Sequence, residues 1–179
     1  DEIGANILPN GLRNISGEKQ FGDCKEWLIS ATNFVFSSEE FNKFPWINFN
    51  DREKQQFVLD EFNYVRTRLT PNQYDEYCSS NFKRIGRGIP LVESMRKILL
   101  RALRDYEALL TQKHWVDHES LTHKVIDALQ EENYSKYRAV LVDEVQDLTQ
   151  NDLKAIGFFK TTEGSLVKDA VNGFFLVGD

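Results

Sequence analysis

The sequence predicts a mostly α-helical protein, in which a helical domain is joined to a small α/β piece with parallel strands. Apolar residues recur at helical spacing over most of residues 23–130. Two short apolar runs, 139–142 and 174–177, flank a further helical segment. A strand, a helix and a strand in this order form a βαβ unit with parallel strands and a right-handed crossover. We therefore expect a loop-rich lead-in over 1–22, a helical domain over 23–130 and an α/β piece over 131–179.

The lead-in is rich in glycine and proline, which favour turns. Asp23 is a candidate N-cap with Glu26 three residues later, a spacing typical of a capping box, so a helix is predicted from Asp23. A short helix is expected over 39–43, where Pro45 follows and prevents its continuation.

A long helix is predicted from Asp51, because apolar residues as far as Leu69 are spaced for one buried face. A second helix is expected over about 71–82. The longest helix should begin at Pro90, since proline is favoured in the first turn. Another helix is expected over 121–130.

Composition and charge limit the class of protein. The chain has 179 residues, of which 41% are hydrophobic and 28% charged, as in ordinary globular domains. It contains no apolar run long enough to span a membrane and no secretory leader, so we expect no membrane partner and a cytoplasmic location. The cysteines, Cys24 and Cys78, form no CxxC pair, and a disulfide framework is not predicted.

Positive charge is concentrated in one part of this acidic chain. Residues 81–105 contain seven basic and two acidic side chains, whereas the whole chain has a net charge of −6. Such asymmetry is typical of an anion-binding surface, although basic stripes on helices are often only solvated faces. The candidate DNA-binding residues are Lys83, Arg84 and Arg87 in a glycine-bracketed loop and Lys97, Arg101 and Arg104 on the following helix. For three phosphate contacts, log affinity for a single strand should fall with log salt with a slope of about −2.

A zinc site is not predicted. His114 and His118 have the i,i+4 spacing of two ligands on one helix face, but no cysteine or other convincing ligand accompanies them.

The polar residues that follow the run 139–142 are the main candidate site. We expect this run to be a strand buried on both faces, because it is apolar without alternation. Open α/β sheets bind ligands where such strands end. Asp143 could join a Mg²⁺ shell, and Glu144 could orient or deprotonate an attacking water. Gln146 could contact a γ-phosphate and Asp147 could orient its neighbours. The simpler interpretation is an acidic turn before a helix that Thr149 caps.

The end of the chain belongs to the same candidate site. Asp179 follows the second apolar run, so parallel strands would place it near Asp143 and Glu144. A buried strand usually continues into a loop that leaves the core, and we therefore expect this sequence to be a segment of a longer protein.

Two stretches resemble one family. Residues 137–156, YRAVLVDEVQDLTQNDLKAI, followed by 174–179, FFLVGD, resemble motif II and the opening of motif III of UvrD/Rep-type superfamily 1 DNA helicases. Val145 stands where the family more often has alanine. Residues 82–91, FKRIGRGIPL, resemble part of the helical 1B insertion of the same helicases. The two matches occur in the family's order, and the first fifty or so residues are only loosely similar.

The resemblance implies a 1B-like helical domain over 23–130 and a partial RecA-like ATPase domain over 131–179. It implies that Asp143 and Glu144 bind Mg²⁺ and that Glu144 also activates the hydrolytic water. It places Gln146, Asp147 and Asp179 at the ATP site. Single-stranded or junction DNA would lie along the insertion. The phosphate-binding sequence GxxxxGK[ST] is absent, as is the glutamine that the family has after motif III's Gly-Asp. We therefore expect no ATP hydrolysis by this chain without a P-loop and a second RecA-like domain.

Two other classes of function are compatible with the residues. One is a non-enzymatic module that binds nucleic acid or protein, in which 143–147 is only an acidic turn. The other is a metal-dependent nuclease that uses Asp143, Glu144 and Asp147 directly, although no further carboxylate and lysine cluster supports it.

Overall fold

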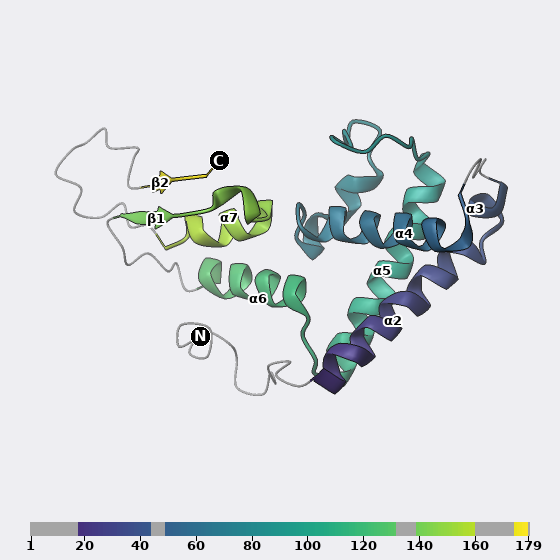
Figure 1. Cartoon of the computed structure of the whole chain (residues 1–179), viewed down its shortest axis with the longest axis horizontal. Helices are drawn as coiled ribbons and strands as arrows, with labels where there is room; N and C mark the ends of the chain where they lie inside the picture. Colours follow the sequence, from purple (N-terminus) through teal and green to yellow (C-terminus); the bar gives the residue numbers. More distant parts are fainter. Residues whose placement is uncertain (1–17, 44–48, 132–138, 160–173, 179) are drawn as a thin grey trace. The chain divides into compact units, whose positions relative to one another are not determined.

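The structure is a computed structural model that describes residues 18–43, 49–131, 139–159 and 174–178. It is mostly helical with one small parallel sheet, which confirms the coarse fold class predicted from the sequence. Two compact units divide the chain, one within Gly11–Asp117 and the other including His118–Asp179. Figure 1 follows the elements along the chain. The lead-in over 1–17 and the segment around Pro45 lie outside the described residues.

The unit within Gly11–Asp117 is helical. Its elements are α2 (Glu18–Phe36), α3 (Glu39–Lys43), α4 (Asp51–Arg66), the 3₁₀ helix η1 (Pro71–Cys78) and α5 (Glu93–Lys113). α2 packs on α4 and α5, and η1 also packs on these two helices. The core between these elements includes the fully buried side chains Val35, Phe62, Tyr74, Leu99 and Leu103. This unit has a sufficient apolar core to hold its helices together.

The sequence predicted most helices of this unit, with errors at their ends. The predicted helix over 39–43 is confirmed as α3. The predicted start at Asp23 was wrong, because α2 begins at Glu18 and Asp23 lies inside it. A capping-box spacing can occur within a helix whose packing against other helices extends it beyond the local signal. The segment after Pro71 forms a 3₁₀ helix that ends at Cys78, and α5 begins at Glu93, three residues after Pro90.

The unit that includes His118–Asp179 contains α6 (His118–Glu131), β1 (Val140–Val142), the 3₁₀ turn η2 (Val145–Asp147), α7 (Gln150–Gly157) and β2 (Phe174–Leu176). β1 and β2 are parallel, with Val140 opposite Phe174 and Val142 opposite Leu176. The predicted parallel pairing is therefore confirmed. α6 packs against α7, and a buried contact between His123 Nε2 and Asn151 Nδ2, 3.2 Å apart, joins the two helices. The predicted cap of α7 is also confirmed, because Thr149 and Asp152 form a capping box.

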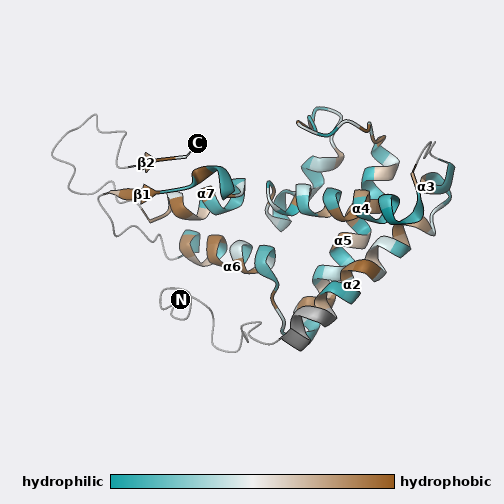
Figure 2. Ribbon diagram, viewed as in Figure 1, coloured by the Kyte–Doolittle hydropathy of each residue, from teal (hydrophilic) through white to brown (hydrophobic). Residues whose placement is uncertain are grey.

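The expectation that 139–142 is buried on both faces was wrong for this chain. Figure 2 shows β1 as a hydrophobic segment, yet Leu141 is 77% exposed, and only Val142 is buried. On the neighbouring strand, Phe175 and Leu176 are 57% and 54% exposed. Parallel sheets in proteins normally have both faces covered. In the part of the chain that the structure describes, two short strands and their helices do not supply that cover.

Candidate functional site

The acidic cluster lies at the carboxyl end of β1, where the backbone makes a sharp turn. Glu144 has a left-handed backbone conformation, with φ of 51° and ψ of 43°. Few side chains other than glycine adopt this conformation, and it costs roughly 1–2 kcal/mol for an L-residue. Such residues concentrate at functional sites, where surrounding contacts hold the strained backbone.

Backbone hydrogen bonds from the neighbouring strand hold this turn. The Val177 N–H donates to the Val142 carbonyl and the Val145 N–H donates to the Val177 carbonyl, both at 2.9 Å. Hydrogen bonding between the two segments thus continues past the ends of both strands. The two bonded residues, Val142 and Val145, lie directly before and after Asp143 and Glu144 in sequence. The carboxyl end of β2 is therefore directly beside the acidic turn, as expected for a βαβ unit.

The side chains of the turn are exposed and contact one another. The Asp143 carboxylate accepts from the Glu144 N–H at 3.0 Å through Oδ1. The Gln146 side-chain amide donates to Glu144 Oε2 at 2.5 Å. Asp147 is exposed and ends η2, and its N–H donates to the Glu144 carbonyl at 2.9 Å. The structure thus brings Asp143, Glu144 and Gln146 together, whereas Asp179 lies outside the described residues.

A glycine that the sequence reasoning did not single out lies against this cluster. A side chain on Gly178 would overlap Gln146 Oε1 and would lie 2.9 Å from Val145 Cγ1. A larger residue at position 178 would therefore require the side chains of Gln146 and Val145 to move. The Gly-Asp pair at the end of the sequence is the signal that could have identified it.

The donor set fits a metal that is held mainly by a bound nucleotide. Mg²⁺ usually keeps several waters and takes one or two carboxylates together with substrate phosphates. Asp143 retains an oxygen without a described hydrogen bond, and both carboxylates are exposed. Within the described ranges no group of three or more histidine, cysteine or acidic side chains could hold a metal ion. Asp143 and Glu144 are therefore the residues of this turn that could take part in a Mg²⁺ shell.

The predicted basic loop is present, but its arginines have partners inside the helical unit. Glu61 of α4 is completely buried and accepts from Arg84 Nε at 3.1 Å, Arg84 Nη2 at 2.5 Å and Arg87 Nε at 2.5 Å. Arg84 Nη1 also donates to the Ile89 carbonyl at 2.5 Å. The Arg84 side chain is only 8% exposed and that of Arg87 is 22% exposed. Arg84 thus closes the loop onto α4, whereas the neighbouring Lys83 is exposed.

Glu61 was missed by the sequence reasoning, although its spacing contained a signal. It lies four residues after Phe57 and four before Val65, so it shares their buried helix face. A carboxylate on such a face needs buried cationic or hydrogen-bonding partners. The Tyr77 hydroxyl is one of them and donates to Glu61 Oε2 at 2.6 Å. Burial, followed by the Glu61 charge, raises the pKa of Tyr77 above its ordinary value.

The basic stripe on α5 is exposed, as its spacing predicted. Lys97 pairs with Glu93 at 2.6 Å and Arg104 pairs with Asp75 at 2.9 Å, both at the surface. The Glu93 carboxylate raises the pKa of Lys97. Arg101 has its guanidinium 5.6 Å from the centre of the Phe34 ring. Exposed pairs of this kind contribute little to stability and exchange readily with other anions.

The histidines show no shared site. His114 is exposed and ends α5 in a left-handed conformation, whereas His123 is buried against Asn151.

In the described part of the chain, no helix has the length and apolar character needed to cross a membrane.

Comparison with known proteins leaves the family undecided. No protein-family model matches this chain, and neither a curated protein nor a solved structure matches it.

Proposed function

We propose that this chain is a segment of an ATP-dependent DNA helicase or translocase of the UvrD/Rep type. The observation that supports the proposal best is the strained backbone of Glu144 at the carboxyl end of a parallel strand. Strained residues of this kind cluster at active sites and ligand-binding sites, which supports a functional role for the turn. Holding a carboxylate in a defined position is useful for orienting a hydrolytic water.

In this proposal each acidic residue has a separate role. Asp143, directly after β1, would hold Mg²⁺, which neutralises charge on the phosphates of bound ATP. Glu144 would accept a proton from, or orient, the attacking water. Gln146 donates to Glu144 at 2.5 Å and would keep that carboxylate in place. Asp147 and Asp179 would complete the polar surroundings of the nucleotide.

The exposed apolar strands agree with a partial RecA-like domain. Leu141, Phe175 and Val177 are between 57% and 77% exposed. In a complete doubly wound sheet such side chains lie under helices on both faces. The remaining helicase chain would supply that cover together with the P-loop and the second RecA-like domain. This chain alone would then be inactive as an ATPase.

The helical unit would contact DNA through its exposed cations. Arg84 and Arg87 both donate to the buried Glu61, so phosphate contacts fall mainly to the exposed side chains of Lys83, Lys97, Arg101 and Arg104. Their contacts would attract single-stranded or junction DNA without reading its sequence. Three such contacts give a salt slope of about −2, and removal of one contact should reduce its magnitude by about 0.7.

The test uses the complete reading frame from which this segment comes. A strand, GxxxxGK[ST] and a helix should be encoded upstream of Asp1. In that protein, Glu144→Gln should lower ATP turnover about a hundredfold or more while ATP still binds. Glu131→Gln, which changes an exposed carboxylate at the end of α6, is the matched control and should leave turnover unchanged. Full turnover in the Glu144 variant, or the lack of a P-loop, would refute the proposal.

A further inference from the structure

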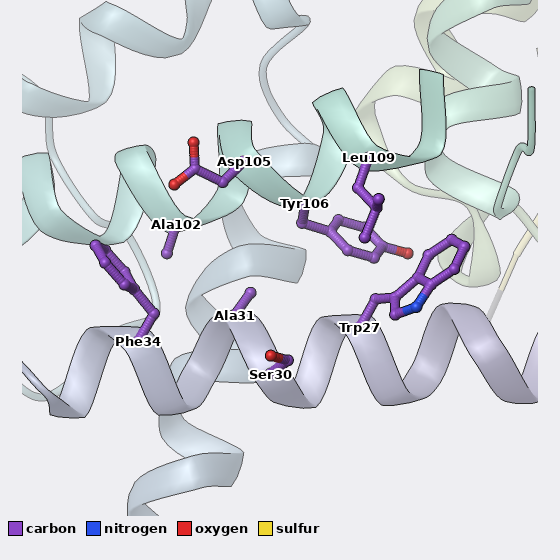
Figure 3. A pocket seen from close by; sticks show the side chains of 8 residues that line it. All are labelled: Trp27, Ser30, Ala31, Phe34, Ala102, Asp105, Tyr106 and Leu109. Carbon is purple, nitrogen blue, oxygen red and sulfur yellow. The ribbon is translucent and has the colours of Figure 1, made fainter. Parts of the chain in front are cut away.

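A groove between α2 and α5 is not explained by the roles assigned so far. It has a volume of about 250 Å³ and lies wholly within the helical unit. Figure 3 shows its lining: Trp27, Ser30, Ala31 and Phe34 come from α2, and Ala102, Asp105, Tyr106 and Leu109 from α5. None of these side chains belongs to the candidate ATP site or to the basic loop.

The groove has an aromatic side chain near each end and small side chains between them. Trp27 and Phe34 lie seven residues apart on α2, which separates them by about 10.5 Å along the helix. Between them the small side chains Ala31 and Ala102 leave the space open (Figure 3). Trp27 is held in place by stacking on Trp115, with ring centres 4.9 Å apart. Phe34 is 41% exposed, an unusual degree of exposure for a phenylalanine next to a core.

A cation lies beside the Phe34 end of the groove, and two more follow on the same helix. The Arg101 guanidinium lies 5.6 Å from the centre of the Phe34 ring. Lys97 and Arg104 are exposed on the same helix, one turn before and one turn after Arg101, and each forms a surface pair that a phosphate could replace, with Glu93 and Asp75 respectively. The Asp105 carboxylate lies on the α5 side of the groove, apart from the aromatic rings, and is exposed (Figure 3). A groove that binds an apolar peptide needs no such row of cations.

We infer that this groove binds an unpaired base of a single-stranded nucleic acid, whose phosphates contact the α5 cations. The base stacks on the Phe34 ring. The Arg101 guanidinium leaves its position near that ring and contacts a phosphate instead. Aromatic platforms beside cationic tracks are the usual means of binding single strands without sequence preference. The inference rests on the proposed function, because it specifies how the helical unit contacts nucleic acid.

The experiment measures binding of fluorescent single-stranded DNA of about ten nucleotides to the whole chain by anisotropy at low salt. Phe34→Ala should weaken binding about fivefold or more, and Phe34→Tyr should retain most of it, since a ring is still available for stacking. Val92→Ala is the control, because it removes an apolar side chain that is 62% exposed at the start of α5, outside the groove. Circular dichroism of each variant verifies that the helices remain folded.

Two further measurements do not depend on the stability of a variant. Tryptophan emission of the unmodified chain should be quenched by the single strand, because the base lies in the groove that Trp27 lines. Double-stranded DNA of equal length should not reproduce that quenching, since its bases are already stacked. Single-stranded RNA of the same sequence should also quench the emission, because stacking does not require a particular sugar.

The outcomes separate this inference from the proposed function. If Lys97→Ala and Arg101→Ala weaken binding while Phe34→Ala does not, the groove is not a base site, but DNA contact by the helical unit stands. Equal quenching by double-stranded DNA would also overturn the base site. If no nucleic acid binds the chain at low salt, both the base site and the DNA contact are refuted.

Discussion

Replacing Glu61 should destabilise the helical unit severely, because this carboxylate neutralises a buried arginine. Glu61 is completely buried and Arg84 is 8% exposed. Removing one member of a buried ion pair leaves the other charged and desolvated, which typically costs about 3–5 kcal/mol. A glutamine at this position keeps one acceptor oxygen for Tyr77 or an arginine, so we expect about 3 kcal/mol for Glu61→Gln. Because domains are stable by only about 5–15 kcal/mol, this loss is a large fraction of the total.

Urea unfolding followed by circular dichroism measures this loss without adding salt. With a slope of about 2 kcal/mol per molar urea, a loss of 3 kcal/mol lowers the midpoint by about 1.5 M. Glu93→Gln is the matched control, since Glu93 forms an exposed pair with Lys97 at 2.6 Å. Exposed pairs contribute about 0–1 kcal/mol, so the control midpoint should hardly move.

A second substitution tests whether the cost comes from the unpaired charge. Arg84→Met in the Glu61→Leu background removes both members of the most deeply buried pair and leaves only Arg87, whose side chain is 22% exposed, without the carboxylate. Apolar replacement of a buried pair is often neutral or stabilising. The double variant should therefore be more stable than Glu61→Leu alone. A loss below about 1 kcal/mol for Glu61→Gln, or equal instability of the single and double variants, would refute this account.

Three further predictions concern the glycine at the acidic turn, alkaline pH and the cap of α7. Gly178→Ala should displace Gln146 and change the amide NMR shifts of the turn, whereas Gly157→Ala, where an added Cβ meets nothing within 4 Å, should not. Burial raises the pKa of three tyrosines that donate to carboxylates, so their stabilisation is present below about pH 10, the pKa of unfolded tyrosine, and is lost as pH rises above it. The free energy of unfolding should fall by about 1.4 kcal/mol per tyrosine at pH 11, and the urea midpoint should fall with it. These residues are Tyr74, Tyr77 and Tyr106, and a constant midpoint between pH 9 and 11 would contradict the prediction. Thr149→Ala should cost about 1 kcal/mol and reduce hydrogen-exchange protection in α7, because the Thr149 hydroxyl accepts from the Asp152 N–H at 3.1 Å; unchanged protection would contradict it.

The local signals of this sequence were reliable where short-range interactions decide the structure. The cap at Thr149 depends on residues three positions apart, and the structure confirms it. The start of α2 was predicted wrongly: the helix begins at Glu18, and Asp23 lies inside it. A capping-box spacing can therefore occur within a helix without marking its start. Parallel pairing of the two apolar runs was predictable, since connection rules leave few alternatives for a strand, helix and strand.

The candidate site was predicted in part. Asp143, Glu144 and Gln146 share one turn because they are neighbours in sequence at the end of β1. The left-handed backbone of Glu144 could not be predicted, because it depends on the hydrogen bonds from Val177 of the other strand. The roles of the cluster in nucleotide hydrolysis stay predictions until the complete protein is tested.

By itself, the sequence determined the helical character, the parallel strands and the clustering of acid and base in different parts of the chain. Only the tertiary structure decided which charges are available to a ligand. Arg84 and Lys83 are adjacent in sequence and equal in charge, yet one is buried on Glu61 and the other is exposed. The partner, Glu61, is on helix α4, 23 positions earlier in the chain. Composition and periodicity describe each segment separately, whereas burial and ion pairing depend on contacts between segments that only folding creates.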